Sequence, residues 1–442
     1  MQNNDHPKGN FIGLIPLIFF LILYISSGII TRNFDNMPLL IAMILASIVA
    51  LALKGDNKND TFEDKLTVFF KGAGQETMIL MIVIFMLAGG FYYVTKSMHA
   101  VETVTNIGLT YLPRPFLVPG VFILGCIISF AMGTSMGTVA ALMPIAASIA
   151  TIGHISMPLM AGVVVSGAMF GDDLSLISAS AIVSAKTQGV TIFDKFKTNT
   201  IMVVPAVLIT IVLLATVTVG SGDVGNLGTI NWVKILPYII VIGLSFMNIN
   251  VMIVLTLGIV SAVVIGMIYG DFGFVAALDA IHKGMLSMGD IAFISLIVGG
   301  LAALMTHMGG IQWLLDKITK HANGQLGGKF AIAFLILLLD VITTNNTVSI
   351  MIAGPIANDL ADTYHISKSY TASILDVFSC VGQGLIPYGG QLLMAAGIAQ
   401  ISAVSIVPYS WYCIVLGIVS VIFLLTRFSP RDGRKQFSAS AE

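Results

Sequence analysis

Long apolar segments that are almost free of charge recur along this chain, and they restrict its fold more than any other feature. A transmembrane helix needs about 20 largely apolar residues. Clear candidates are the segments 11–31, 37–53, 77–95, 200–219, 231–247, 251–269, 287–306 and 409–427. Only 10% of the 442 residues are charged, whereas a soluble domain carries about 25%. We therefore expect an all-α polytopic protein of the plasma membrane that has the lipid bilayer as a partner and binds no nucleic acid.

Three other sequence features bear on processing, on the membrane interface and on cofactors. Residues 11–31 are too long for the apolar core of a signal peptide and have no convincing cleavage site, so we interpret them as a retained first helix. Residues 61–75 are amphipathic and are expected to lie along the membrane interface. The three cysteines fall within apolar runs and have no metal-binding spacing. We expect no cofactor besides coupling ions and no attached soluble domain.

Two further apolar regions, 115–186 and 330–405, are interrupted by polar residues, glycine and proline. Each region can hold two full spans, or a re-entrant hairpin followed by a broken helix. Lysine and arginine collect on the cytoplasmic side of a membrane protein, and the hairpin arrangement places 16 of the 21 on one side, against 12 for full spans. The sequence therefore predicts about ten transmembrane helices with both termini in the cytoplasm. The interrupted regions become hairpins at 115–152 and 330–364 and broken helices at 157–186 and 368–398.

The two interrupted regions resemble one another. Residues 144–156 (PIAASIATIGHIS) and 355–367 (PIANDLADTYHIS) match at seven of thirteen positions, with a constant offset of 211. We therefore predict an internal duplication, with a first repeat at 1–220 and a second at 231–430. Five crossings and one hairpin in each repeat would insert the second copy upside down. Inverted repeats with discontinuous helices near the membrane midplane are typical of secondary transporters, although duplicated channels also exist.

Polar residues mark the turn of each predicted hairpin. The first turn reads GTSMGT at 133–138, and the second reads TTNNT at 343–347. Their hydroxyl and amide oxygens suit Na⁺, and the helix after each turn presents main-chain N–H groups to an anion such as a carboxylate. The same side chains can instead simply cap the helices. The candidate binding residues in the turns are Thr134, Ser135, Thr138, Thr344, Asn345, Asn346 and Thr347.

Each predicted broken helix carries a second group of candidates. The first break reads GDDLS at 171–175. Two acids in an apolar run cost about 2.5–3.5 kcal/mol each on insertion scales, which usually signals a cation or proton pathway. The second break reads GQGLIPYGG at 382–390, where glycine and proline free main-chain carbonyls. At the offset of 211, Gln383 stands where Asp172 does. The candidates in the breaks are Gly171, Asp172, Asp173, Ser175, Gln383 and Gly384.

Three more acids lie within or beside apolar segments. Asp340 and Asp376 fit a functional role and a role as helix–helix anchors equally well, and we keep Asp376 among the candidate site residues. Asp290 lies near a predicted interface, which favours a structural role. His154 and His365 occupy matching positions and are interpreted as loop residues rather than proton relays.

Four of these motifs, taken together, resemble the signatures of NhaC-type Na⁺/H⁺ antiporters, a family of the wider ion-transporter superfamily. They read GTSMGTVAALMPIA (133–146), GAMFGDDLSLIS (167–178), TTNNTVSIMIAGPIA (343–357) and DVFSCVGQGLIPYG (376–389). The resemblance covers most of the chain. It implies an elevator-like transport domain of hairpins and broken helices, held by a scaffold that often dimerises. It also implies exchange of Na⁺ and H⁺ in some relatives and transport of amino acids or organic acids in others.

The chain departs from the family pattern at one position. The pattern after Gly-Asp usually continues toward Ser-Asp-Thr-Thr, and here Ser178, itself a candidate, is followed by Ala179 in place of the acid. The change removes a natural carrier of a cation or proton, for which Asp173 could compensate. It raises the expectation of an organic solute.

The leading hypothesis is a secondary active transporter, not an enzyme, that couples Na⁺ and/or H⁺ to antiport or to transport of a small amino acid or carboxylate. Asp172 and Asp173 are expected to bind the coupling cation or proton. Na⁺ itself is expected at Asp172, Thr134 and Asn345. A homodimer is expected. The alternatives are strict Na⁺/H⁺ exchange without an organic solute, a passive channel, and a membrane-embedded aspartyl protease that pairs Asp172 with Asp340 or Asp376.

Overall fold

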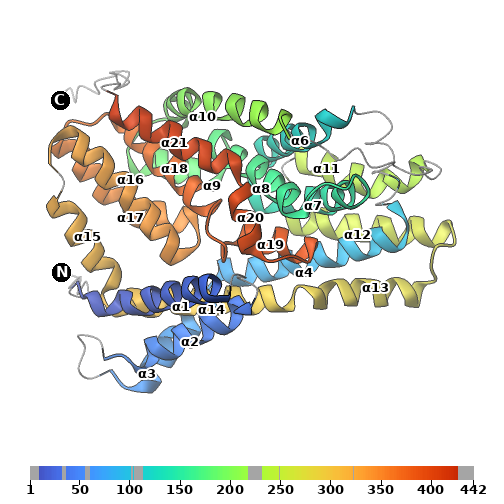
Figure 1. Cartoon of the computed structure of the whole chain (residues 1–442), viewed down its shortest axis with the longest axis horizontal. Coiled ribbons are helices and arrows are strands. Elements are labelled where there is room, and N and C mark those ends of the chain that lie inside the picture. The colour runs from blue at the N-terminus through green and yellow to red at the C-terminus, as the bar shows by residue number, and fades with distance from the viewer. Residues whose placement is uncertain are drawn as a thin grey trace, which may run out of the picture.

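The computed structural model describes residues 9–31, 36–54, 60–100, 103, 113–217, 231–247, 249–321 and 323–426. Every regular element in these ranges is a helix (Figure 1). By length and composition, 8 of the described helices can cross a membrane, or up to 9 if a bent pair near the C-terminus counts as one span. The all-α polytopic fold that the sequence predicts is therefore confirmed.

The helices of the two halves follow one another in a similar order, with 3₁₀ helices written η. Those described in the first half are η1 (Phe11–Leu14), α1 (Ile15–Thr31), α2 (Leu39–Ala52), α3 (Phe62–Ala73), α4 (Glu76–Ser97), η3 (Arg114–Phe116), α6 (Leu117–Met132), α7 (Ser135–Ile152), α8 (Met157–Leu174), α9 (Ala179–Thr187) and α10 (Ile192–Ala215). Those described in the second half are η4 (Trp232–Ile235), α11 (Leu236–Phe246), α12 (Val251–Ile268), α13 (Phe274–Ser287), α14 (Gly289–His307), α15 (Gly310–His321), α16 (Gly324–Thr343), α17 (Asn346–Thr363), α18 (Lys368–Gln383), α19 (Gly390–Ala399), α20 (Ala403–Ile406), η5 (Val407–Tyr409) and α21 (Trp411–Leu425).

Two helical segments lie outside the spans that apolar composition predicts, namely the first turns of α10 (Ile192–Ala215) and the whole of α13 (Phe274–Ser287). α10 begins at Ile192 rather than near residue 200, because Thr191 caps its N-terminus by accepting a hydrogen bond from the main-chain N–H of Asp194 at 3.1 Å. α13 precedes α14 and packs along α4. Hydropathy detects the stretch of a helix that meets lipid or an apolar core, so polar ends and amphipathic helices escape it.

Both predicted hairpins and both broken helices are present. α6 and α7 meet at residues 133–134, and α16 and α17 meet at residues 344–345. Residues 175–178 separate α8 from α9, and residues 384–389 separate α18 from α19. Figure 1 shows α16–α17 at the left, α6–α7 at the right and the broken helices between them. α7 packs against α19, and α17 packs against α9, so each hairpin contacts the broken helix of the other half.

Other helices lie on two sides of this group, and those on one side form a layer (Figure 1). Figure 1 shows α1, α2, α3, α4, α12, α13 and α14 along the lower side, with α10 and α21 along the upper side. Within the layer, α14 packs on α2 and α3, and α4 packs on α12 and α13. The hairpins and broken helices therefore lie between two sets of helices.

Backbone geometry supports the predicted duplication. Non-glycine residues rarely adopt a left-handed backbone, yet such backbone recurs at the offset of 211 found in the sequence. The matched pairs are Gly133 with Thr344, His154 with His365, and Gly189 with Gln400. The first pair lies at the hairpin turns, the second follows the hairpins, and the third follows α9 and α19. The two histidines thus lie just after the ends of α7 and α17, in agreement with their interpretation as loop residues.

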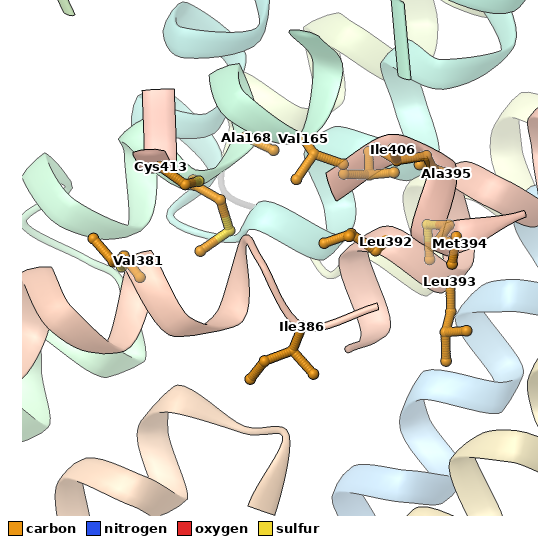
Figure 2. Packing of buried hydrophobic residues seen from close by; sticks show 14 of the residues in the cluster. Val165, Ala168, Val381, Ile386, Leu392, Leu393, Met394, Ala395, Ile406 and Cys413 are labelled. Atoms are coloured by element: carbon orange, nitrogen blue, oxygen red, sulfur yellow. The ribbon is translucent and has the colours of Figure 1, made fainter. Parts of the chain in front are cut away.

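The second break is surrounded by buried apolar side chains. Ile386 of the break is buried, and Figure 2 shows side chains of α8, α19, α20 and α21 gathered on the other side of the backbone of the break. Gly384 permits this packing, since a Cβ at that position would lie 2.2 Å from Cys413 Sγ. Beyond the break, α19 bends by 103° into the segment formed by α20 and η5. The break is thus held by close packing on the side of Cys413.

Candidate functional site

One cavity lies where both hairpin turns and both helix breaks meet. Its volume is about 230 Å³. The first half lines it with Gly133, Thr134, Ser135, Met136, Asp172, Ala179 and Ser180. The second half lines it with Val251, Thr344, Asn345, Asn346, Thr347, Gln383, Gly390 and Gln391, while Thr77, Leu80, Met81 and Ile84 of α4 complete it. The fold therefore brings candidate residues from both halves to one place.

Four helices of the hairpins and broken helices begin at this cavity, namely α7, α9, α17 and α19, because their first residues Ser135, Ala179, Asn346 and Gly390 line it. A fifth helix, α12, also begins there with Val251. The first main-chain N–H groups of a helix have no partner within the helix, and they give its N-terminus a partial positive charge. The side chains of Ser178 and Asn345 cap α9 and α17, whereas α7 and α19 have no side-chain cap. Among the described residues, the lining contains no lysine or arginine. The cavity therefore offers a diffuse positive field without a basic side chain.

Asp172 is the acid of the cavity lining. Ser135, at the first hairpin turn, donates its main-chain N–H at 3.2 Å and its hydroxyl at 2.5 Å to the Asp172 carboxylate. The Asn346 side chain, at the second hairpin turn, lies close to the same carboxylate. Asp172 is 6% exposed, so these contacts offset part of the cost of burying its charge. Both hairpins therefore reach one acid.

Asp172 and Asp173 lie on the last turn of α8 and not, as predicted, within the break itself. The break begins at Ser175. Side chains of α10 satisfy a main-chain carbonyl at this helix end: Lys195 Nζ and Asn199 Nδ2 donate to Asp173 O at 2.9 and 2.8 Å. Carbonyls at a helix C-terminus have no partner within the helix, so these donors allow α8 to continue through both acids.

A chain of hydrogen bonds crosses the cavity from one half to the other. Gln383 Nε2 donates to Thr344 O and to Gln391 Oε1, both at 2.9 Å. Gln391 Nε2 donates to Ser135 Oγ at 2.9 Å, and the Ser135 hydroxyl donates in turn to Asp172. A main-chain carbonyl can only accept, so Thr344 O fixes the orientation of both amide groups. Neutral groups therefore connect the second hairpin turn to Asp172.

A second polar cluster lies behind Asp172 and outside the cavity lining. Lys195 of α10 forms an ion pair with Asp376 of α18. Asn199 Nδ2 donates to Asp376 Oδ2 at 2.9 Å, and the Tyr412 hydroxyl of α21 donates to Asp173 Oδ2 at 2.7 Å. All five residues are at most 1% exposed. The Asp376 carboxylate therefore pairs with the ammonium group of Lys195 rather than with the carboxyl group of another acid.

Sequence reasoning missed Lys195, Asn199, Tyr412 and Gln391. Charge counting treats Lys195 as a loop residue, but Lys195 is buried within α10. Its spacing of four residues from Asn199 was a usable signal, because residues i and i+4 share a helix face. Gln391 could have been found through the repeat, since Ser180 stands at the matching position. Tyr412 gives no comparable signal.

Several predicted site residues lie outside the cavity lining, namely Thr138, Gly171, Asp173, Ser175, Ser178, Asp376 and Gly384. Thr138 donates its hydroxyl to Thr134 O at 3.0 Å. Gly171 allows α8 to approach α6, since a Cβ there would lie 2.1 Å from Ser129 Oγ. Ser178 donates to Asp172 O at 3.0 Å while it caps α9. These residues shape the surroundings of the cavity.

The two remaining candidate acids lie elsewhere. Asp290 lines a separate pocket of about 700 Å³ between the connection of α1 to α2, α14 and the bend after α19. Asp340 of α16 is fully buried and faces Gly382 of α18. At the offset of 211, Ser129 and Gly171 form the equivalent contact in the first half, so a polar side chain packs on a glycine in each repeat.

A sequence model of the Na⁺/H⁺ antiporter family matches residues 10–220 and 215–428. The chain belongs to this family. It is 23% identical to the malate-2H⁺/Na⁺-lactate antiporter of Bacillus subtilis over 93% of both chains. It is 24% identical to the Na⁺/H⁺ antiporter NhaC of Bacillus subtilis, over 92% of this chain and 95% of that protein. It is also 24% identical to the arginine/ornithine antiporter ArcD of Halobacterium salinarum, over 92% of this chain and 90% of that protein.

These matches confirm the NhaC-type resemblance, and the chain is a multi-pass secondary transporter. In this member of the Na⁺/H⁺ antiporter family, the position where the resemblance led us to expect an acid is part of the cavity. Ala179 is the first residue of α9 and lines the cavity. The expected departure from the family pattern therefore falls at the candidate site itself.

Proposed function

We propose that this member of the Na⁺/H⁺ antiporter family couples Na⁺ and/or H⁺ to the movement of a small solute that carries a carboxylate group. The observation that carries the proposal is the convergence of four helix N-termini from the hairpins and broken helices on a cavity that contains Asp172. Helix N-termini bind carboxylates through main-chain N–H groups. Malate, lactate, arginine and ornithine, for which two of the relatives are named, all carry a carboxylate.

The proposed Na⁺ site is formed by Asp172, Thr134 and Asn345. All three residues line the cavity, and they come from α8 and from the two hairpin turns. Hard cations take oxygen ligands such as carboxylates, carbonyls and hydroxyls. Because Na⁺ and a proton would compete for the Asp172 carboxylate, binding of one would exclude the other. This competition is the simplest coupling that the geometry supports.

The proposed movement is elevator-like. The hairpins and broken helices would move as one unit against the layer that contains α1–α4 and α12–α14, carrying the cavity with them. The contacts of α7 with α19 and of α17 with α9 support one unit, because each hairpin is joined to the other half. A homodimer, with both termini of each chain in the cytoplasm, completes the proposal. Cross-linking in membranes and protease access to terminal tags test these two points.

Purified protein in liposomes tests the proposed coupling. An imposed Na⁺ or H⁺ gradient should drive uptake or exchange of at least one amino acid or organic acid. Thermal-shift measurements with and without Na⁺ narrow the choice of solute, because a ligand that binds the folded state raises its stability. If neither the Na⁺ gradient nor the H⁺ gradient drives any flux, the proposal is contradicted. Na⁺/H⁺ exchange without any solute would establish strict antiport, and currents far above carrier turnover would indicate a channel.

Asp172→Asn tests the proposed cation site. The substitution keeps the size of the side chain and removes the charge, so Na⁺ dependence should disappear while the protein remains folded. Asp290→Asn is the matched control, because Asp290 lies in the separate pocket. Unchanged Na⁺ dependence in Asp172→Asn would show that the cation binds elsewhere.

A further inference from the structure

The ammonium group of Lys195 occupies a position of the kind that a metal cation takes. It forms an ion pair with the Asp376 carboxylate and donates to Asp173 O at 2.9 Å. Asp173 O is a main-chain carbonyl at the C-terminal end of α8, where the helix carries a partial negative charge. Carboxylate and carbonyl oxygens are the ligands that hard cations prefer.

We propose that Lys195 is a tethered cation that fills a second cation site, so that the protein binds a mobile coupling cation at the Asp172 site alone. Lysine suits this role because its ammonium is a compact point charge on a flexible stem. The inference rests on the proposed Na⁺ site at Asp172 and goes beyond it, since it concerns how many cations bind and does not depend on the solute.

Oxygen atoms without hydrogen-bond partners, on the residues around the Lys195 ammonium, support a cation site that the ammonium fills. Asp173 Oδ1, Asn199 Oδ1 and Asp376 Oδ1 are buried and have no hydrogen-bond partner among the residues that the structure describes. The three side chains are each 0% exposed. Buried polar atoms are normally paired. If the ammonium were removed, these oxygens and the carbonyl of α8 would offer several ligands to Na⁺.

The repeat-related position in the second half has no ammonium group. At the offset of 211, the second half has Ile406 where the first has Lys195, and Gly384 where the first has Asp173. Ile406 is buried among apolar side chains. The ammonium on α10 and the carbonyl on α8, the helix that also carries Asp172, therefore belong to the first repeat, whereas the Asp376 carboxylate comes from the second.

The test measures Na⁺-dependent stability rather than transport. In an Asp172→Asn background, unfolding of the purified protein should not respond to Na⁺ when choline keeps the ionic strength constant. Adding Lys195→Ala should restore a rise in Tm that saturates with Na⁺ concentration, because a cation that binds the folded state stabilises it. Lys195→Arg should show no such rise. Lys283→Ala, which removes a half-exposed ion pair with Asp279 on α13, is the matched control.

A Lys195→Ala protein that is monodisperse but shows no Na⁺-dependent rise would overturn the proposal. Asp376→Asn added to Lys195→Ala should abolish the rise, because it removes the carboxylate ligand. The wild-type protein gives a check that does not require a change at Lys195. Equilibrium dialysis with radioactive Na⁺ should find one bound Na⁺ per chain, and two would overturn the proposal. Failure of solute transport in liposomes leaves these binding measurements unchanged, so the two proposals fail separately.

Discussion

Ser135 directs both of its donors at Asp172, the main-chain N–H at 3.2 Å and the hydroxyl at 2.5 Å. Ser135 is the first residue of α7, and Asp172 lies on the last turn of α8. The first hairpin turn and the end of α8 are therefore joined at the acid. The same hydroxyl accepts a hydrogen bond from Gln391, so α19, which follows the second break, reaches this point as well.

Ser135→Ala should weaken cation binding without unfolding the protein. The substitution removes the hydroxyl but keeps the main-chain N–H, and a hydrogen bond to a charged group contributes about 1.5–3 kcal/mol. Since about 1.4 kcal/mol corresponds to a tenfold change in affinity, the Na⁺ concentration for half-maximal transport should rise by about tenfold or more. Ser135→Thr keeps a hydroxyl and is the control. Equal Na⁺ activation of Ser135→Ala and wild type would show that the bond is unimportant for the cation.

Gln391→Leu should separate solute binding from cation binding. It interrupts the chain of hydrogen bonds between Gln383 and Ser135 but leaves the Asp172 carboxylate in place. Na⁺ should still stabilise the protein, whereas the apparent solute affinity should lose its dependence on Na⁺. Gln188→Leu is the matched control, because Gln188 is a buried glutamine that bonds Gly354 O away from the cavity. Retained Na⁺ dependence in Gln391→Leu would mean that coupling does not pass through this chain.

Ala179→Asp should change the cation response, because Ala179 lines the cavity that contains Asp172. A second carboxylate would strengthen the negative potential in a space of about 230 Å³. Half-maximal Na⁺ activation should therefore occur at lower Na⁺, and binding of an anionic solute should weaken. Ala179→Asn adds a side chain of similar size without the charge. If Asp and Asn variants behave alike in liposome transport, the effect is steric and the electrostatic explanation is wrong.

Gly171→Ala should destabilise the contact between α8 and α6. The added Cβ would lie 2.1 Å from Ser129 Oγ and 2.2 Å from the main-chain carbon of Ser129, so rotation of a side chain cannot relieve the clash. Overpacking of this kind costs about 1–3 kcal/mol. The repeat-related Gly382→Ala should cost less, because its nearest neighbour is a carboxylate oxygen of Asp340 at 3.0 Å.

Thermal unfolding in detergent checks the order of these two glycine variants. Gly120→Ala is the control, since a Cβ at Gly120 would meet nothing within 4 Å. A Gly171→Ala protein as stable as Gly120→Ala would show that the helices separate without cost.

Much of the site could be predicted because membrane proteins rarely tolerate polar residues without a reason. Ser135, Asn345 and Asp172 stand out from apolar surroundings, and all three line the cavity. Lys195 could not be recognised in the same way, because it stands close to other polar residues, Asp194, Lys197 and Asn199, near the start of α10. Its burial depends on the packing of α10 against α18 and α8, which no local pattern records.

The sequence by itself determined the environment of the protein and the order of its elements. Apolar runs must match the thickness of the bilayer, and glycine, proline and acids mark where an apolar helix turns or ends. The tertiary structure decided which of the polar residues meet. Ser135 contacts Asp172 across 37 positions and Gln391 across 256. Hydropathy sums over neighbours in the chain, whereas a hydrogen bond depends on neighbours in space. Lys195 resembles a loop residue in the sequence, and only the tertiary structure shows that its charge is buried.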